Sequence, residues 1–293
     1  MSSVAVVANQ NKRVGGLPEL RRILEREGVS NPMWHEVQKS REAPKRVRQA
    51  LDSGADLVFV WGGDGMVQHC VGALANTKAA LAVVPAGTAN LFAANLRIPD
   101  DIAQAVALGL RGRRKKFDIG RMNGESFAVF AGAGFDASMV NDASRKVKRR
   151  LGRGAYVWAG AKNLGAAPFQ ATIDVDGDRW YGGPASCILF GNVRKMSGGL
   201  EVFEDAEPDD GLLDLGVVTA DGRADWMRTL ARTAFGHANR SRFVRVTRGR
   251  SVRVQLNRKV LYELDGGARE KKKTFHVEID PSAVTVCVRE NGV

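Results

Sequence analysis

Cysteine and histidine are scarce in this sequence, with three cysteines and four scattered histidines among 293 residues. Cys70, Cys187 and Cys287 lie far apart, and apolar residues flank each of them. Neither a disulfide framework nor a metal-binding spacing can be built from them. We therefore expect buried free thiols in a protein of the reducing cytosol.

The sequence also lacks a long uninterrupted apolar run. Residues 79–96 carry no charge, but Pro85, Gly87, Thr88 and Asn90 interrupt them, so a membrane span is not expected. The N-terminus has no basic region before its apolar run and continues directly into strand-like sequence. This pattern is not that of a secretory signal.

Several catalytic and nucleotide-binding motifs are missing. No Gly-Lys dipeptide occurs, which rules out the Walker pattern, and neither G-x-S-x-G nor H-E-x-x-H is present. Residues 132–137 match G-x-G-x-x-A after a strand. However, no acidic residue follows about 20 positions on, where the dinucleotide fold has its ribose partner. A P-loop, a serine hydrolase, a zincin and a dinucleotide fingerprint are therefore not supported.

Positive charge is abundant. The net charge is +12 and the pI is about 10.0, which predicts attraction to polyanions. Basic residues cluster at 111–116, 144–150 and 240–253, the last with six arginines. Few aromatic residues are interleaved with them, so nucleic acid is not the expected partner. Solvated surface charge and an anionic membrane face remain as explanations.

The hydrophobic pattern changes near residue 122. Before it, apolar strands at 4–9, 56–61 and 81–85 alternate with amphipathic helical segments, which indicates a parallel sheet covered on both faces. After it, short alternating strands predict an antiparallel β-sandwich, with helical stretches at about 137–164 and 223–238. Residues 251–264 and 274–288 each read as two short strands. We predict an α/β domain at 1–122 and a β-sandwich domain at 123–282, with about 283–293 as a candidate segment returning to the first.

Three turns follow predicted parallel strands, at residues 9–16, 62–66 and 85–90. Ligands of open parallel sheets bind beyond the carboxyl ends of the strands, so three small or polar turns there favour a nucleotide site. Asp64 is the carboxylate of the central turn. It could cap the following helix, or hold the Mg²⁺ of a bound triphosphate.

Six segments occur in an order typical of one family: GGDGM (62–66), VVPAGTANLFAANL (83–96), DIGRMNGESF (118–127), GAGFDA (132–137), PDDGLLDLGVV (208–218) and ELDGG (263–267). The chain resembles the diacylglycerol kinase catalytic-domain family, which includes bacterial lipid kinases and sphingosine kinases. The resemblance covers nearly the whole length. It implies an NAD kinase/diacylglycerol kinase-like fold, ATP and Mg²⁺ as cofactors, ATP bound between the two domains, and phosphate transfer to a lipid hydroxyl.

Carried over position by position, the resemblance implies several roles. Asp64 would organise Mg-ATP, and Asp136 would lie near the lipid acceptor. Asp210, with the main-chain carbonyls of Glu207 and Leu212, would hold a structural magnesium. The residues implied to bind the nucleotide are Asn9, Gln10, Asn11, Lys12, Arg13, Gly62, Gly63, Asp64, Gly65, Met66, Val67, Gln68 and Thr88.

The sequence departs from the family pattern at several of these positions. Met66 replaces a threonine whose hydroxyl could meet phosphate, Leu91 replaces an aspartate, and the first loop lacks the customary N-P-x-S-G form. The D-G-E motif, whose glutamate is the family's assigned proton acceptor, reads Asp265-Gly266-Gly267. Glycine cannot act as a base. Asp265 is therefore the candidate base, unless positioning and charge neutralisation suffice for the transfer.

The expected function is that of an ATP-dependent lipid kinase acting on diacylglycerol or a related lipid. It would be a cytoplasmic protein that associates peripherally with the inner, anionic face of the membrane. Two alternatives stay open: a catalytically silent lipid- or nucleotide-binding protein, suggested by Met66, His69 and Gly267, and an NAD kinase-like small-molecule kinase. The sequence leaves the lipid acceptor open, as it does the choice between monomer and homodimer.

Overall fold

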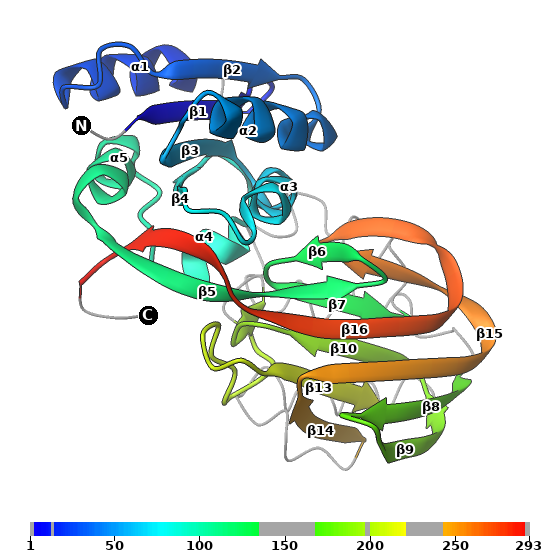
Figure 1. Cartoon of the computed structure of the whole chain (residues 1–293). Helices are drawn as coiled ribbons and strands as arrows, with labels where there is room; N and C mark the ends of the chain where they lie inside the picture. The colour runs from blue at the N-terminus through cyan, green and yellow to red at the C-terminus, as the bar shows by residue number, and fades with distance from the viewer. Residues whose placement is uncertain (1–2, 13–14, 135–167, 197–199, 221–242, 291–293) are drawn as a thin grey trace, which may run out of the picture. The chain divides into compact units, whose positions relative to one another are not determined.

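A computed structural model of the chain describes residues 3–12, 15–134, 168–196, 200–220 and 243–290. The chain divides into two compact units, residues 1–119 with 280–293 and residues 120–279. The sequence placed these boundaries at 122 and 282. The helical stretches expected at 137–164 and 223–238 lie outside the described residues. Figure 1 gives the order of the elements.

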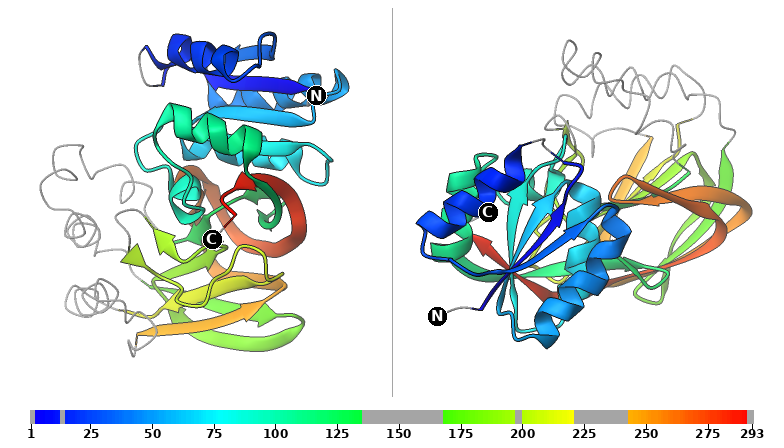
Figure 2. Two further views of the ribbon diagram at one scale, coloured as in Figure 1. Left: turned by 90° about the vertical axis from the view of Figure 1, so that its left-hand side faces the viewer. Right: turned by 90° about the horizontal axis from the view of Figure 1, so that it is seen from above.

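The first unit is built on a parallel sheet with the strand order β2-β1-β3-β4-β16. Helices cover both of its faces, α1 and α5 on one and α2 and α3 on the other (Figure 2). Its strands are β1 (Val4–Asn9), β2 (Met33–Val37), β3 (Leu57–Gly62) and β4 (Ala80–Pro85), with the end of β16 (Gly267–Val288). Its helices are α1 (Gly16–Arg26), the 3₁₀ turn η1 (Ser40–Glu42), α2 (Ala43–Asp52), α3 (Asp64–Leu74), α4 (Leu91–Asn95) and α5 (Ile102–Arg111).

The central strands β1, β3 and β4 are buried along their whole length, as strands packed by helices on both faces must be. Leu20, Ile23 and Leu24 of α1 and Ile102 and Val106 of α5 pack on the same face of the sheet. The alternation read from the sequence thus arises from a covered parallel sheet. None of the helices in the described ranges is long and apolar enough to cross a membrane.

The second unit is antiparallel, and its main ladder runs β14-β13-β10-β7-β15-β16. Strand β8 pairs with β15 and β9, and β6 pairs with β5. The strands are the end of β5 (Arg113–Met122), whose first residues belong to the first unit, with β6 (Glu125–Phe127), β7 (Phe130–Ala133), β8 (Phe169–Val175), β9 (Asp178–Ala185), β10 (Cys187–Gly191), β11 (Lys195–Met196), β12 (Leu200–Glu201), β13 (Leu213–Val218), β14 (Val244–Gly249), β15 (Ser251–Leu264) and most of β16.

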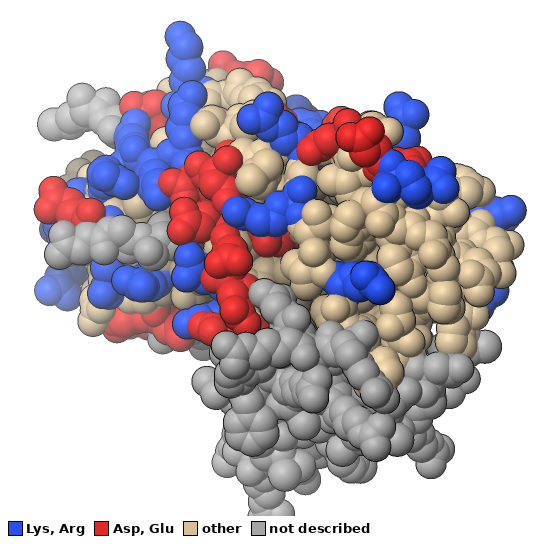
Figure 3. All heavy atoms as spheres, turned by 90° about the horizontal axis from the view of Figure 1, so that it is seen from below, with Lys and Arg blue, Asp and Glu red and all other residues tan. Residues whose placement is uncertain are grey.

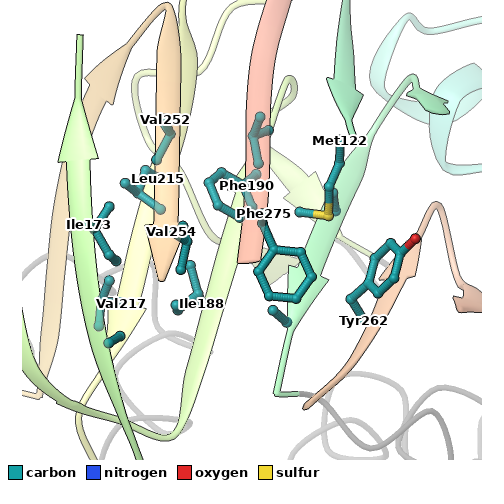
Figure 4. Close-up of a cluster of buried hydrophobic side chains, with 14 of the residues drawn as sticks. Met122, Ile173, Ile188, Phe190, Leu215, Val217, Val252, Val254, Tyr262 and Phe275 are labelled. Carbon is teal, nitrogen blue, oxygen red and sulfur yellow. The ribbon is translucent and has the colours of Figure 1, made fainter. Parts of the chain in front are cut away.

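Alternate residues of these strands form one apolar core. Ile188 and Phe190 of β10, Leu215 and Val217 of β13, and Val252 and Val254 of β15 point into it, with Phe275 and Tyr262 in edge-to-face contact (Figure 4). A buried face and an opposite face on each strand are what a β-sandwich requires. The predicted fold class, a parallel α/β domain followed by an antiparallel β-sandwich, is confirmed.

The strand lengths differ from expectation. Residues 251–264 form one strand and 267–288 another, where the sequence suggested two short strands in each segment. Strand β16 continues through Pro281, with Ser282 at a φ of 52°. This strand contributes residues 280–288 to the first unit, where Thr285 and Val286 pair with β4. The three cysteines are buried and free, as predicted.

Candidate functional site

Two glycine turns of the first unit contact each other through their backbones. Strands β3 and β4 are parallel neighbours, so the turns that follow them meet at one edge of the sheet. The Ala86 N–H donates to the Gly62 carbonyl at 2.8 Å. A Cβ added to Gly87 would lie 2.5 Å from the Cα of Gly63, and one on Gly63 would lie 2.9 Å from the Cα of Gly87. Only glycine allows this approach.

Asp64 joins the start of α3 to the start of α4. Its Oδ1 accepts a hydrogen bond from the Phe92 N–H at 3.4 Å, and the N–H groups of Asn90 and Leu91 also stabilise the carboxylate. Burial raises the pKa of Asp64, and these backbone donors oppose that shift. Asp64 therefore caps the neighbouring helix α4 in addition to its place at the N-terminus of α3.

Asn90 shapes the second turn. Its Oδ1 accepts from the Gly87 N–H at 2.9 Å, and its Nδ2 donates to the Gly87 carbonyl at 3.4 Å. Asn90 adopts the left-handed conformation, with a φ of 48°, which asparagine tolerates better than most residues. Thr88 is exposed at the top of this turn. A ligand at the sheet edge would therefore meet Thr88 and backbone groups.

The three residues after Gly65, which were predicted to contact the nucleotide, turn their side chains into the interior, so any contact would be through their backbone. The side chains of Met66, Val67 and Gln68 are buried. The N–H groups of Met66 and Val67 donate to the Gly63 carbonyl. Met66 packs against Gly62, where an added Cβ would lie 2.4 Å from the Met66 Cβ. The apolar residue that replaces threonine thus fills the interior, and Gly65 is the exposed residue of the turn.

The loop after β1 is held by asparagine side chains. Asn9 is buried, its Nδ2 donates to the Ser40 hydroxyl at 3.3 Å, and its Oδ1 accepts from the Asn11 N–H at 3.0 Å. Gln10, Asn11 and Lys12 are exposed. Arg13 lies outside the described residues. The loop therefore presents three exposed polar residues at the same sheet edge, and their contact with nucleotide remains a prediction.

In the second unit, Asp265 is occupied by backbone groups. It forms with Gly266 a two-residue hairpin turn between β15 and β16, and both have positive φ values, 46° and 79°. The Asp265 carboxylate accepts three N–H groups, from Ala128, Val129 and Phe130, at 2.7–2.9 Å. These three donors hold the carboxylate in place beside the start of β7. The geometry gives Asp265 an anchoring role in the hairpin, and its expected role as base stays a prediction.

Glu263 lies two residues before Asp265 on β15 and is buried. Burial, with the charge of Asp265 as a smaller cause, raises the pKa of Glu263 to about 7. Because Tyr262 and Leu264 point into the core, Glu263 faces the other side of the sheet. No role was predicted for this residue from the sequence, although it is the single acidic residue in the apolar run VLYEL.

The expected metal site at Asp210 is occupied by an arginine. The Asp210 Oδ1 accepts from the Leu212 N–H at 3.0 Å, and its Oδ2 contacts the Arg248 guanidinium. The Arg248 Nε also lies 3.3 Å from Asp214, its cross-strand partner, whose pKa burial raises to about 6. Glu207 pairs with Arg194. The described residues contain no group of three or more His, Cys, Asp or Glu side chains that could hold a metal ion. The predicted magnesium site at Asp210, which uses two main-chain carbonyls, stays a prediction.

The charged surface is mixed where it is described. Arg113, Arg114 and Lys116 of the run at 111–116 are exposed, whereas the run at 144–150 and Asp136 lie outside the described residues. On the face in Figure 3, Lys and Arg are interspersed with Asp and Glu. The attraction to anionic membranes remains a prediction.

Sequence reasoning missed three residues that the structure makes prominent: Asn90, Arg248 and Glu263. Asparagine three residues after a glycine in a turn was a signal for the first. Arg248 was counted among surface arginines, because nothing in the sequence shows which charge lies opposite it. Glu263 is the first residue of the segment ELDGG, but nothing in that segment indicated a function for it.

The fold and the paired turns define a two-domain protein of the diacylglycerol kinase and NAD kinase type. Residues 4–122 match the model of the diacylglycerol kinase catalytic domain, and residues 129–288 match that of the YegS C-terminal NAD kinase beta sandwich-like domain. The chain therefore belongs to the diacylglycerol kinase catalytic-domain family, as the resemblance implied.

Individual relatives agree with this assignment. A "probable lipid kinase YegS-like" of Cronobacter sakazakii is 32% identical over 61% of this chain and 62% of its own length, so that match spans less than two thirds of the relative. The diacylglycerol kinase of Mycobacterium tuberculosis is 31% identical over 78% of this chain and 69% of its own. A solved structure of a diacylglycerol kinase from Bacillus anthracis shares the fold, with a TM-score of 0.79 at 23% identity, covering 99% of this chain and 97% of that chain.

Proposed function

We propose that the protein is an ATP-dependent lipid kinase that transfers the γ-phosphate to the hydroxyl of diacylglycerol or a related lipid. The observation that carries the proposal is the contact between the turns at Gly63 and Gly87, at the carboxyl ends of two adjacent parallel strands. Bare backbone at such an edge suits phosphate groups. Membership of a lipid kinase family supplies the reaction class.

Within this proposal, each part of the sheet edge has a task. The exposed Gly65, at the N-terminus of the 11-residue helix α3, presents backbone to the triphosphate. Thr88 offers a hydroxyl, and the loop of Gln10, Asn11 and Lys12 offers polar side chains and one positive charge. Asp64 is the carboxylate that would hold Mg²⁺ with bound ATP, and that ion would neutralise phosphate charge.

Labelled ATP and Mg²⁺, supplied with a panel of lipids in mixed micelles, test the proposal directly. We expect label on one class of lipid bearing a free hydroxyl and none without protein. The panel should include diacylglycerol, monoacylglycerol, a sphingoid base and phosphatidylglycerol, with NAD as a soluble acceptor. Transfer to NAD alone would overturn the lipid assignment. ATP binding without transfer to any acceptor would favour a catalytically silent binder.

We also propose that the substrate is reached at an anionic membrane surface. The net charge of +12 and the exposed Arg113, Arg114 and Lys116 support it, since each basic residue near such a surface contributes about 1 kcal/mol. Binding to vesicles with phosphatidylserine should exceed binding to neutral vesicles and fall as salt is raised. Equal binding to both vesicle types at all salt concentrations would contradict it.

A further inference from the structure

Two paired strands of the second unit lose their alternation of buried and exposed residues at the same place. Along β15, buried and exposed residues alternate as far as Leu256, but residues 257–259 are all exposed. Along β16, residues 270–274 are all exposed, and alternation begins again at Phe275. A strand that lies against a core exposes only every second residue. These two segments therefore project beyond the core of the β-sandwich.

A shift in the pairing of the two strands accounts for this. Gln255 pairs with Thr274 and Val260 pairs with Lys272, so residues 256–259 of β15 lie opposite Lys273 alone. A bulge of this kind bends the longer strand and increases its twist. Strands β15 and β16 curve sharply together (Figure 1). The irregular pairing allows successive side chains of both strands to reach solvent.

Most of the side chains exposed in this way are basic. Glu270 is the one acidic residue of the two segments, against five basic residues, which we call the basic hairpin: Arg258, Lys259, Lys271, Lys272 and Lys273. Among the residues that the structure describes, none forms an ion pair with the four lysines of this set. Their positive charge is therefore not neutralised by side chains of the described structure.

Two of these basic groups lie over aromatic rings at the rim of the core. The Lys272 Nζ is 5.9 Å from the ring centroid of Tyr262, and the Arg258 Cζ is 5.8 Å from that of Phe169. Both rings are buried. Neither ring can therefore stack on the base of a nucleic acid, which is how single strands gain much of their affinity. The hairpin suits a surface of phosphate groups better than a nucleic acid.

Protection of an exposed strand pair does not account for this set of charges. Charged side chains on exposed strands prevent aggregation, but mixed charges serve that purpose as well. Here lysines of β16 lie opposite the segment of β15 that carries Arg258 and Lys259. Like charges on neighbouring strands destabilise the pair. An anionic surface would relieve this repulsion.

We propose that the basic hairpin is the surface by which the protein docks on a bilayer that contains anionic phospholipids. The inference rests on the proposed membrane attachment and assigns it to the second unit rather than to the exposed residues of 113–116. Each Lys or Arg beside such a surface strengthens binding about fivefold, the equivalent of about 1 kcal/mol. Because salt screens charges beyond about 8–10 Å, basic residues gathered on one projecting bend act together, and dispersed ones do not.

Co-sedimentation of the full-length protein with phosphatidylcholine vesicles, with and without phosphatidylserine, tests the proposal. A variant that combines Lys271→Gln, Lys272→Gln and Lys273→Gln should bind the phosphatidylserine vesicles about 100-fold more weakly than wild type. Thermal unfolding should show that it is at least as stable as wild type, because repulsion is removed.

The matched control removes the same amount of positive charge from exposed positions of the first unit. It combines Arg41→Gln on η1 with Lys45→Gln and Arg48→Gln on α2. Its binding to phosphatidylserine vesicles should stay within about threefold of wild type, because these residues lie outside the docking surface. Equal weakening by the two variants would show that net charge alone attracts the protein, and would overturn the proposal.

The other outcomes separate this inference from the proposal on which it rests. If wild type prefers phosphatidylserine vesicles and the hairpin variant binds them as tightly, the hairpin is not the docking surface and the membrane attachment stands. If wild type shows no such preference, the attachment fails and the inference fails with it. Tighter binding of wild type to duplex or single-stranded RNA than to these vesicles at the same salt, lost in the hairpin variant, would assign the surface to nucleic acid instead.

Discussion

The Asp64 carboxylate accepts the Phe92 N–H at 3.4 Å, and this contact connects the first turn of α3 to the first turn of α4. The residue that the sequence singled out as a metal ligand is thus also a helix cap for a different helix. The two roles of Asp64, capping α4 and holding a metal ion by its charge, can be tested separately. Asparagine at this position keeps an acceptor oxygen and lacks the charge.

Asp64→Ala should lower the free energy of unfolding by about 1–3 kcal/mol, because the N–H groups at the start of α4 lose their acceptor. Asp64→Asn should stay within about 0.5 kcal/mol of wild type. Both should lose lipid phosphorylation if the charge holds Mg-ATP. Denaturant unfolding and kcat measured on the same preparations check this. Full turnover in Asp64→Asn would show that Asp64 serves only to position the start of α4 and that its charge does not hold Mg-ATP.

Gly87→Ala should force the two turns apart, because its Cβ would lie 2.5 Å from the Gly63 Cα and 2.6 Å from the Asn90 Oδ1. We expect a loss of stability of about 1–3 kcal/mol, typical of overpacking. Gly182→Ala is the control, since no heavy atom lies within 4 Å of its added Cβ. Equal melting temperatures for the two variants would contradict the contact between the turns.

Gly65→Ala separates ligand binding from folding. Its added Cβ has no neighbour within 4 Å, and its φ lies outside the left-handed region, so the melting temperature should change little. If triphosphate lies against this bare turn, the new methyl group obstructs it, and the Kd for Mg-ATP should rise by at least about tenfold, or about 1.4 kcal/mol. Calorimetric titration measures this. An unchanged Kd would place the phosphates elsewhere.

The pH dependence of the free energy of unfolding tests whether the pKa of Glu263 is raised, and this test does not require catalytic turnover. Its pKa is about 7 in the folded protein against an ordinary value of 4.5, so between these values the folded state keeps a proton that the unfolded state has lost. Stability should therefore fall as pH rises through this window, by at most about 3 kcal/mol from this group. Glu263→Gln should remove that part of the fall and be more stable than wild type at pH 8. Parallel stability curves for the two proteins would exclude the raised pKa.

Arg248→Ala should destabilise the second unit by about 1–3 kcal/mol, because it leaves the buried Asp214 without its cross-strand partner. Arg245→Ala, exposed on the same strand, is the control. Mg²⁺ without nucleotide should leave the melting temperature of wild type unchanged, because the Arg248 guanidinium already pairs with both Asp210 and Asp214. A clear rise on addition of Mg²⁺ would instead favour the metal site first expected at Asp210.

Much of the fold could be predicted from the sequence because it depends on local periodicity. The buried strands β1, β3 and β4 read as continuous apolar runs, and the second unit as alternating ones, since a strand covered on two faces differs in pattern from a strand covered on one. The hairpin at Asp265-Gly266 is equally local, because few residues other than Asp, Asn and Gly adopt the positive φ values it needs.

Contacts between residues that are far apart in the sequence could not be predicted from local periodicity. The sequence suggested about 283–293 as a candidate segment returning to the first unit, but nothing local indicates that Thr285 and Val286 pair with β4, or that Arg248 lies opposite Asp214. The roles of carboxyl groups depend on the same long-range contacts: three N–H groups from residues 128–130 occupy Asp265, while Glu263, two residues away, has no partner in the described structure. The sequence by itself determined the fold class, the family and the turns at the carboxyl ends of the parallel strands. Only the tertiary structure decided which acid is anchored and which is buried without a partner, because hydrogen bonding and desolvation depend on what the folded chain places around each group.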